Sequence, residues 1–533
     1  MTEGRAPSAR KTRNNSSTGH LYTLSSKQEN QVSPEGESDQ AKLERLGRQR
    51  PEKLGSLWQE IGFVFSIAVS QLINEYFVSG FTILLPTVAE ALEIPASSST
   101  WPASAFSLVI SSFLLPFGRI ADMYGGFPVY LSGCLWCAIW SLIAGFARNQ
   151  LMLDICRALQ GLGPAAYLPA GLQLLGSMYR PGPRKNLIFS IYAAMAPLGF
   201  FVGIFFAGVA GQFATWRWYF FIGSIIVAIA TVVAWFAVPS DMEEHKGNDV
   251  KMDWLGSLTT TVGLILLVFA ITDSSHAPSG WTTPYILVTF ILGLIIIGVA
   301  FYVEGWIAEQ PLLPFEAFKA KSVRPFALGL IFVYGTLGIY LLYASLYCLR
   351  ILGVGQFQLV AWYAPAGTLG IILAICGGFV LHIVHPLVLM AITSLAIIVE
   401  SVLFALAPPD ANYWAWIFVP MICSTIAVDF IFNVANIFFT SQLPARQQGL
   451  AGALSNVLLQ LGIALLLGFA EIVATQTADQ GLRRSYQNVF WFNLACGATA
   501  LVVFMGVVRI ERAKSDLTAD EREALNEDEV QET

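Results

Sequence analysis

The sequence predicts an all-α polytopic membrane protein with fourteen membrane-spanning helices. Of the 533 residues, 55% are hydrophobic and 12% are charged. Soluble domains carry about 25% charged residues, so this composition excludes a soluble globular protein. A helix needs about 20 apolar residues to cross the hydrocarbon core. Runs of that kind recur at 61–86, 99–118, 128–147, 151–176, 187–211, 217–238, 254–272, 284–303, 325–349, 358–381, 386–407, 414–440, 448–473 and 489–509.

The distribution of lysine and arginine sets the expected orientation, because loops rich in these residues stay in the cytosol. With the amino terminus inside, the inner loops hold Arg119, Arg180, Arg184, Lys185, Lys246, Lys251, Lys319, Lys321, Arg324 and Arg446. The outer loops hold fewer, namely Arg148, Arg217, Arg350, Arg483 and Arg484. We therefore expect both termini in the cytosol.

A sequence pattern that occurs in both halves of the chain predicts that the spans form two related six-helix bundles with two extra helices between them. In both halves a tryptophan precedes a glycine and a polar residue four positions on, and a proline follows: Trp101, Gly118, Asp122 and Pro128, then Trp362, Gly378, His382 and Pro386. The predicted division is a disordered cytosolic tail (1–57), a first bundle (58–240), a linker with two extra helices (241–324), a second bundle (325–510) and an acidic cytosolic tail (511–533).

Two motifs give a resemblance to a known family. Gly118-Arg119-Ile120-Ala121-Asp122-Met123-Tyr124-Gly125 lies between the second and third spans, and Arg157-x-x-Gln160-Gly161-x-Gly163 lies in the fourth. Together they resemble the major facilitator superfamily of secondary transporters. The 6+2+6 arrangement resembles its fourteen-span drug:proton antiporter branch. The segments 154–161 and 181–186 resemble a fungal subgroup that contains aminotriazole-resistance-type pumps and toxin exporters.

The resemblance assigns roles to two groups of small and charged residues. Gly118, Arg119, Asp122 and Gly125 would form a cytoplasmic gating loop. Met123, Gly126 and Phe127 stand where the family usually has basic residues, so its charge network is expected to be weak, and a purely structural tight turn is the alternative. A second group on the fifth span partly matches the family's antiporter motif and would let helices pack closely: Pro197, Gly199, Gly203 and Gly208.

Acidic side chains inside apolar spans are the proton-coupling candidates, because an ionisable residue at membrane depth is costly and usually functional. Glu75 belongs to a polar stripe with Gln71, Asn74, Ser79 and Thr82, and Asp429 belongs to another with Asn433, Asn436 and Thr440. Burial favours the protonated form of a carboxyl group, as a proton carrier requires. A structural glutamate that stays protonated is the alternative for Glu75.

The fourth span adds Asp154 and Arg157, which lie one helical turn apart and could form an ion pair. In the family the matching arginine faces the central cavity and tunes a neighbouring acid; a static salt bridge is the alternative. Glu400 and Glu471 lie nearer the outer ends of their spans, and we expect them to meet water.

Further polar residues are candidates to line a substrate cavity. Tyr340, Tyr343 and Tyr347 form a stripe with Thr336 that suits a flat aromatic ligand, with core packing or an interfacial belt as the alternatives. The remaining cavity candidates have a structural alternative, because polar residues in membrane helices also hold helices together. These candidates are Gln71, Asn74, Gln160, Asn433, Asn436, Asn456 and Gln460.

The sequence thus predicts a proton-coupled exporter of a small amphipathic organic molecule, working by alternating access. It needs no cofactor or metal beyond the proton gradient, and its partners are the substrate, protons and the lipid bilayer, with no nucleic acid. A monomer in the plasma membrane is expected. An enzyme is not, because the chain contains no P-loop, HExxH or GxSxG motif. The alternatives are a transporter of ammonium or borate, and a transport-dead membrane sensor.

Overall fold

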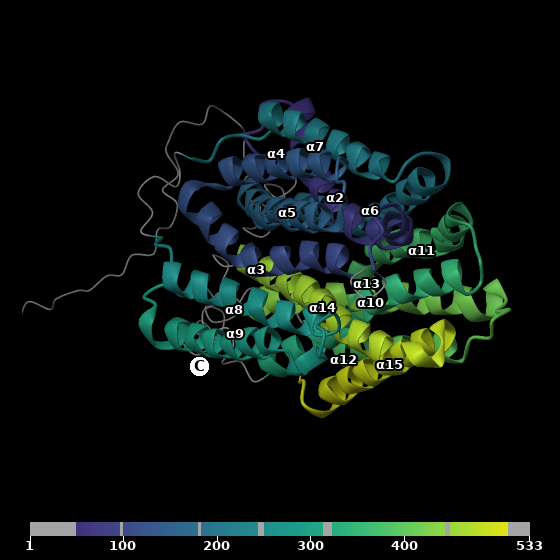
Figure 1. Ribbon diagram of the computed structural model, residues 1–533. Helices are drawn as coiled ribbons and strands as arrows, with labels where there is room; N and C mark the ends of the chain where they lie inside the picture. The colour runs from purple at the N-terminus through teal and green to yellow at the C-terminus, as the bar shows by residue number, and fades with distance from the viewer. Residues whose placement is uncertain are drawn as a thin grey trace, which may run out of the picture.

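The computed structural model describes residues 49–95, 100–179, 183–242, 250–312, 322–442 and 448–509. The two predicted tails therefore lie largely outside the described residues. The described residues form fourteen long α-helices (Figure 1): α2 (Leu57–Ala91), α3 (Trp101–Tyr124), α4 (Gly126–Ala144), α5 (Gln150–Met178), α6 (Pro183–Phe213), α7 (Arg217–Ala237), α8 (Trp254–Asp273), α9 (Pro284–Tyr302), α10 (Val323–Arg350), α11 (Gln356–Ile383), α12 (Pro386–Leu406), α13 (Val419–Gln442), α14 (Gln448–Gln476) and α15 (Leu482–Gly506).

The all-helical membrane fold expected from the sequence is confirmed. Thirteen of the described helices are long and apolar enough to cross a membrane. The fourteenth, α5, carries Asp154, Arg157 and Gln160, which lower its apolar content. It packs along α3 and α4, and several of its polar side chains are buried against these neighbours. A helix sheltered in this way does not need an apolar surface of its own.

The first span is longer than the sequence suggests. We expected it to end at Pro86, but α2 runs through this proline to Ala91. Proline removes one backbone hydrogen bond and usually ends or kinks a helix. Membrane helices tolerate the loss because neighbouring helices and hydroxyl side chains satisfy the freed backbone groups. The other end is set by Ser56, whose side chain accepts a hydrogen bond from the backbone nitrogen of Gln59.

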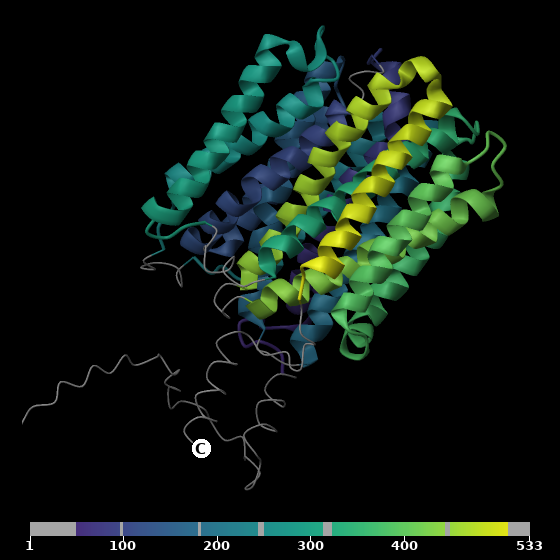
Figure 2. The same cartoon turned by 90° about the horizontal axis from the view of Figure 1, so that it is seen from below.

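The helices pack in two groups with a hairpin beside them. Helices α2–α7 contact one another, as do α10–α15, and the two groups meet where α3 crosses α14 and where α6 crosses α11. Helices α8 and α9 pair with each other, and α8 also packs against α3 and α14 (Figures 1 and 2). The exact domain boundaries at residues 240, 324 and 510 stay a prediction.

We call the end of the molecule at which α2 begins and α15 finishes the proximal end, and the opposite one the distal end. Figure 2 shows the α8–α9 turn and the α14–α15 turn together at the distal end. The predicted orientation places the proximal end in the cytosol.

Helix α6 lies between two close interfaces that its small residues make possible. A Cβ atom on Gly199 would overlap the carbonyl oxygen of Leu72 on α2, and one on Gly203 would lie 2.5 Å from the carbonyl oxygen of Tyr76. On the other side, Gly208 faces α11, and the Cβ of Pro197 would be 2.8 Å from a Cβ on Gly370 of α11. The four residues of the predicted packing motif are thus split between an interface within the first group and one across the two groups.

Candidate functional site

Arg157 is the most deeply buried charged side chain of the first helix group, with 1% of its surface exposed. Its guanidinium donates to the carbonyl oxygens of Pro102 (3.0 Å) and Phe77 (3.0 Å) and to Oε1 of Gln160 (2.7 Å). It also lies 4.3 Å from the ring centres of Phe81 and Phe106. A guanidinium spread over aromatic faces and carbonyls keeps its charge at lower cost than an isolated one.

Gln160 extends this network to a third helix, because its Nε2 donates to Oγ of Ser141 on α4 at 2.7 Å. The sequence-based idea that Asp154 and Arg157 pair is wrong for this conformation. No ion pair joins them in the part of the chain that the structure describes, and Oδ1 of Asp154 is buried without a hydrogen-bond partner there. Arg157 instead turns toward α2 and α3, where the backbone carbonyls of Phe77 and Pro102 accept from two of its nitrogens, while the third donates to Gln160 of its own helix.

Glu75 lies on α2 within a small polar cluster. Its Oε1 accepts a hydrogen bond of 2.9 Å from Nδ2 of Asn74, and the side chain is half-buried. One turn earlier, Oε1 of Gln71 accepts from the hydroxyl of Tyr192 on α6 at 2.9 Å. No basic side chain lies within ion-pair distance of Glu75 among the described residues. The structure therefore places the candidates Gln71, Asn74 and Glu75 side by side between α2 and α6.

Asp429 occupies the crossing of the two helix groups. Its Oδ2 would lie 3.4 Å from a Cβ on Gly370 of α11, next to Pro197 of α6. Nδ2 of Asn433 donates to the backbone oxygen of Asp429 at 2.8 Å, so this amide forms its hydrogen bond within α13. Asn436 is half-buried further along α13. The carboxyl group of Asp429 thus faces the α6–α11 crossing.

The tyrosine stripe of α10 lies inside the second helix group. The Tyr347 hydroxyl donates to the carbonyl oxygens of Ala407 (2.9 Å) and Pro408 (3.0 Å), and Tyr343 packs edge-on against Tyr486 of α15. Tyr340 packs edge-on against Phe404 of α12, and its hydroxyl has no hydrogen-bond partner among the described residues. In this conformation Tyr343 and Tyr347 fit the core-packing alternative better than a cavity wall, whereas Tyr340 retains a free hydroxyl.

Helix α14 carries the cavity candidates Asn456 and Gln460, both buried. Neither Oε1 nor Nε2 of Gln460 has a hydrogen-bond partner within the described residues, and the same holds for the nearby hydroxyl of Ser455. A buried amide without partners costs about 1–3 kcal/mol. A residue kept at that cost is a candidate to bind something that the protein alone does not supply.

The end of the predicted gating loop is held by hydrogen bonds to a residue outside the sequence motif. Gly125 has φ +99°, a conformation that favours glycine, and the carboxylate of Asp241 accepts from the backbone nitrogens of Gly126 (2.7 Å) and Phe127 (3.0 Å). A carboxylate at the start of α4 is also favoured by the helix dipole. Gly118 faces Pro169 of α5, and Asp122 is exposed.

Arg119 of the same motif lies within α3, because this helix continues past the expected end of the span at residue 118 to Tyr124, and it contacts the linker that carries α8 and α9. It donates to Oε1 of Gln310 at 2.7 Å and to the carbonyl oxygen of Lys251 at 3.1 Å. The predicted gating motif therefore contacts the residues that flank the extra hairpin, a link that the motif alone does not predict.

A buried ion pair at the proximal end was not anticipated. Glu60 on α2 has 4% of its surface exposed, and its Oε1 accepts from Nε of Arg184 at 2.8 Å and from the hydroxyl of Tyr179 at 3.1 Å. The hydrogen bond and the charge of Glu60 raise the pKa of Arg184 above its usual value. The sequence signal was present in the segment 181–186, but the partner lies more than 100 positions away.

The expectation that Glu400 and Glu471 meet water is wrong. Only 2% and 3% of their surfaces are exposed. Glu400 accepts from Nδ2 of Asn493 on α15 at 3.4 Å. The error came from placing each residue along its helix, because depth along a helix does not tell which face meets the other helices.

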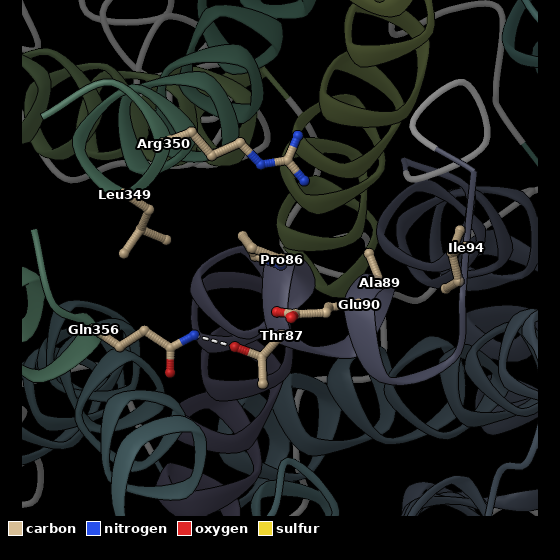
Figure 3. A pocket seen from close by; sticks show the side chains of 8 residues that line it. All are labelled: Pro86, Thr87, Ala89, Glu90, Ile94, Leu349, Arg350 and Gln356. Atoms are coloured by element: carbon tan, nitrogen blue, oxygen red, sulfur yellow. Dashed lines mark hydrogen bonds between the residues drawn. The ribbon is translucent and has the colours of Figure 1, made fainter. Parts of the chain in front are cut away.

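A pocket of about 440 Å³ opens at the distal end between the last turns of α2 and α10 and the start of α11. Figure 3 shows the Arg350 guanidinium and the Glu90 carboxylate reaching into it from opposite helices, and the amide of Gln356 bonded to the hydroxyl of Thr87. Arg350 also donates to the hydroxyl of Tyr486 at 3.3 Å. The pocket is thus lined by one acidic and one basic side chain.

Comparison with known proteins agrees with this geometry. The sequence model described as "Major Facilitator Superfamily" matches residues 67–467. A low affinity ammonium transporter of Saccharomyces cerevisiae is 33% identical over 86% of this chain and 89% of its own length. The aminotriazole resistance protein of the same yeast is 32% identical over 88% of each chain. The efflux pump terJ of Aspergillus terreus is 29% identical over 89% of this chain and 92% of its own length.

The fold has counterparts among solved structures. An auto-inhibited peptide transporter of the POT family superposes with a TM-score of 0.60 at 15% identity, covering 86% of this chain and 99% of that one. At that identity the likeness concerns the fold alone. The profile match over most of the chain, the fourteen helices and the named relatives agree: the chain is a multi-pass membrane transporter of the Major Facilitator Superfamily and groups with fungal drug-efflux proteins, so it is not an enzyme.

Proposed function

We propose that this protein exports a small amphipathic organic molecule in exchange for protons, by alternating access between the two helix groups. Under this proposal it acts as a monomer in the plasma membrane with both termini in the cytosol. The crossings of α3 with α14 and of α6 with α11 are the surfaces that would part and close.

The observation that carries the proposal is the environment of Glu75. A carboxylate inside a membrane helix is costly unless it is paired. Glu75 has an amide neighbour but no basic partner among the described residues. A side chain in that position is most stable with a proton bound and can release it when water reaches the site. Asp429 at the α6–α11 crossing is the second candidate.

The organic substrate rests on the relatives. One is named an efflux pump and another a resistance protein against aminotriazole, a small polar aromatic compound. The unpartnered amide of Gln460 and the charged distal pocket with Glu90 and Arg350 would suit a molecule with both polar and apolar parts.

The test begins with a panel of amphipathic compounds, measured for efflux from cells that express the protein, with and without a protonophore. A compound that is exported is then used with purified protein in vesicles. Transport driven by a pH gradient and exchange of labelled for unlabelled substrate are measured separately. We expect Glu75→Gln to lower gradient-driven transport at least about tenfold, while exchange continues because it needs no net proton movement.

Glu93→Gln is the matched control, since this glutamate is exposed at the distal end. It should behave as wild type in both assays. If Glu75→Gln keeps full gradient-driven transport, the coupling role passes to Asp429. If the protonophore leaves wild-type efflux unchanged, proton coupling itself is wrong.

Ammonium transport is the second candidate, because the 33% identical yeast relative is named a low affinity ammonium transporter. Uptake of labelled methylammonium by cells that express the protein tests it directly. Saturable uptake above the level of an empty vector, with no compound of the panel exported, would replace organic export by this function.

A further inference from the structure

The α8–α9 hairpin follows α3 along its whole length. At the proximal end Arg119 of α3 reaches Gln310, as described above. In the middle, Oγ1 of Thr261 donates to the carbonyl oxygen of Ser112 at 2.9 Å. At the distal end, Nε1 of Trp101 donates to Oδ1 of Asp273 at 3.3 Å. Three attachments over one helix fix the hairpin to the first helix group.

The same hairpin also touches α14 of the second group. Val268 packs against Ala464 of α14 and Leu108 of α3 in one small apolar cluster. One turn further, a Cβ on Gly468 of α14 would lie 2.9 Å from Oγ1 of Thr272. Helix α8 therefore covers the crossing of α3 and α14, which must open and close if the two groups move against each other.

At the distal end of this crossing, Glu471 of α14 is held from two sides. Its Oε2 accepts from the hydroxyl of Thr100, the residue that precedes α3. Its Oε1 lies 3.4 Å from Nε2 of His276, in the turn after α8. The side chain of Glu471 is 3% exposed and that of His276 12% exposed. Neither Oε1 of Glu471 nor Nε2 of His276 has a hydrogen-bond partner among the described residues.

The charges around this pair are mostly acidic. On the α8 side, Nδ1 of His276 lies 3.8 Å from Oδ1 of Asp273, and Asp273 accepts from the hydroxyl of Tyr285 on α9 at 2.8 Å. On the α10 side, Tyr343 interacts electrostatically with Glu471. Among the described residues, the start of α3 contributes Trp101 and the preceding Thr100, which carry no charge. No lysine or arginine makes an ion pair with these acids among the described residues.

From this juxtaposition we propose that Glu471 and His276 form a proton-binding site that closes the distal end: one proton, held on Oε1 of Glu471 and donated to Nε2 of His276, latches α14 to the α8–α9 turn and to Thr100 of α3. Without that proton the crossing buries the charges of Glu471 and Asp273 together, which favours separation into water. With the proton bound, Oε1 of Glu471 donates a hydrogen bond to Nε2 of His276, so both atoms gain a partner. The negative charge of Glu471 is removed from the buried crossing.

The imidazole is the acceptor in this arrangement. Burial lowers the pKa of His276, while Asp273 acts in the opposite direction to a smaller extent. The closed state thus keeps His276 neutral, and separation exposes it to water, where a histidine has a pKa of about 6.5. Closure therefore takes up one proton on Glu471 above about pH 6.5. Below that pH the open state also takes up a proton, on His276, and the two effects cancel.

This predicts a characteristic pH dependence of distal closure. The ratio of closed to open molecules rises up to about tenfold for each pH unit from pH 8.5 down to about 6.5, as one linked proton requires, and then levels off. The test uses purified full-length protein without substrate. Spin labels on Glu93→Cys and Gln480→Cys, which flank α3 and α14 at the distal end, report the distance by pulsed electron resonance after replacement of the native cysteines. Both labelled positions are exposed.

Three variants separate the parts of the site. Glu471→Gln carries a neutral amide in place of the protonated acid, so it should stay closed without a pH response from pH 8.5 down to about 6.5, and should open below that pH, where only the open state takes up a proton, on His276. His276→Gln keeps an acceptor but cannot titrate, so the rise should continue below pH 6.5 without levelling off. Thr100→Val removes one hydrogen bond and no titrating group, so it should lower the closed fraction and keep the pH dependence.

A wild-type distance distribution that does not change between pH 5 and 8.5 would overturn the proposal, and so would a Glu471→Gln protein that keeps the full pH response. The outcome does not depend on the proposed export function, because no substrate is present. Running the series in a Glu75→Gln background keeps the two proposals apart. The distal response should persist there even if gradient-driven transport is lost.

Discussion

Two buried polar clusters of similar chemistry differ in how far the protein itself satisfies them. In the first helix group, the three donors of Arg157 meet two backbone carbonyls and Gln160, and Gln160 in turn binds Ser141. In the second group, both polar atoms of Gln460 are buried without a partner among the described residues. The hydroxyls of Tyr334 and Tyr340 are in the same situation there.

The difference indicates that the two clusters have different roles. A fully satisfied network fixes one arrangement of α2, α3, α4 and α5, because moving any helix would break a hydrogen bond to a buried charge. Partnerless polar groups lose nothing when a neighbouring helix moves or a ligand arrives. We therefore expect the Arg157 cluster to act as a rigid part of the first group, and the face of the second group with Gln460 to respond to substrate.

Replacing Arg157 should have the largest effect. Arg157→Lys keeps the charge, but a single ammonium cannot reach Phe77, Pro102 and Gln160 together. Leaving buried groups unpaired beside a charge costs about 3–5 kcal/mol, so the thermal midpoint in detergent should fall sharply and transport should be lost. Arg148→Lys, at an exposed arginine of the α4–α5 turn, is the control. A stable Arg157→Lys protein would mean that the network is not rigid.

The glycines of α6 and α11 test the same contrast at helix interfaces. Gly199→Ala pushes a Cβ into the backbone of α2 and should destabilise the protein by about 1–3 kcal/mol. The methyl group added by Gly370→Ala would contact Pro197 across the two helix groups. It should therefore change transport and the ratio of open to closed molecules more than the free energy of unfolding. Gly298→Ala, with no atom near its added Cβ, serves as the control and should be neutral or slightly stabilising. Equal destabilisation by Gly199→Ala and Gly370→Ala would remove the distinction.

The fold was predictable from the sequence, because length, apolar runs and two motifs determine a fourteen-helix membrane protein almost by themselves. Gln71, Asn74 and Glu75 lie side by side, as their spacing along one helix indicates, and their role in transport stays a prediction. The partners of Arg157, Glu60 and Glu471 were not predicted. They come from helices distant in sequence, and a pattern along one helix carries no information about the rotation of its neighbours.

Two glutamines offer a matched test of intermediate size. Gln160→Leu removes a partner of Arg157 and should cost about 1–3 kcal/mol. Gln460→Leu removes an amide that has no partner to lose, so stability should stay level or rise. If Gln460 contacts the substrate, the apparent affinity of the Gln460→Leu protein for that substrate should fall while the protein remains folded. Thermal unfolding and concentration-dependent efflux, measured on both variants, decide this. A large loss of stability in Gln460→Leu would show that its amide is satisfied in the membrane.

Removing single hydroxyl groups gives the smallest and cleanest comparison. The Tyr219 hydroxyl donates to the carbonyl oxygen of Tyr76 at 2.5 Å, and the Tyr76 hydroxyl returns a bond of 2.7 Å to the carbonyl of Tyr219. Tyr219→Phe should therefore cost about 1 kcal/mol. Tyr340→Phe should cost nothing, because its hydroxyl has no partner among the described residues. Any loss of transport in Tyr340→Phe at unchanged thermal stability then identifies a contact made only with the transported molecule, whereas a matching loss of stability in both variants would contradict the division between the two clusters.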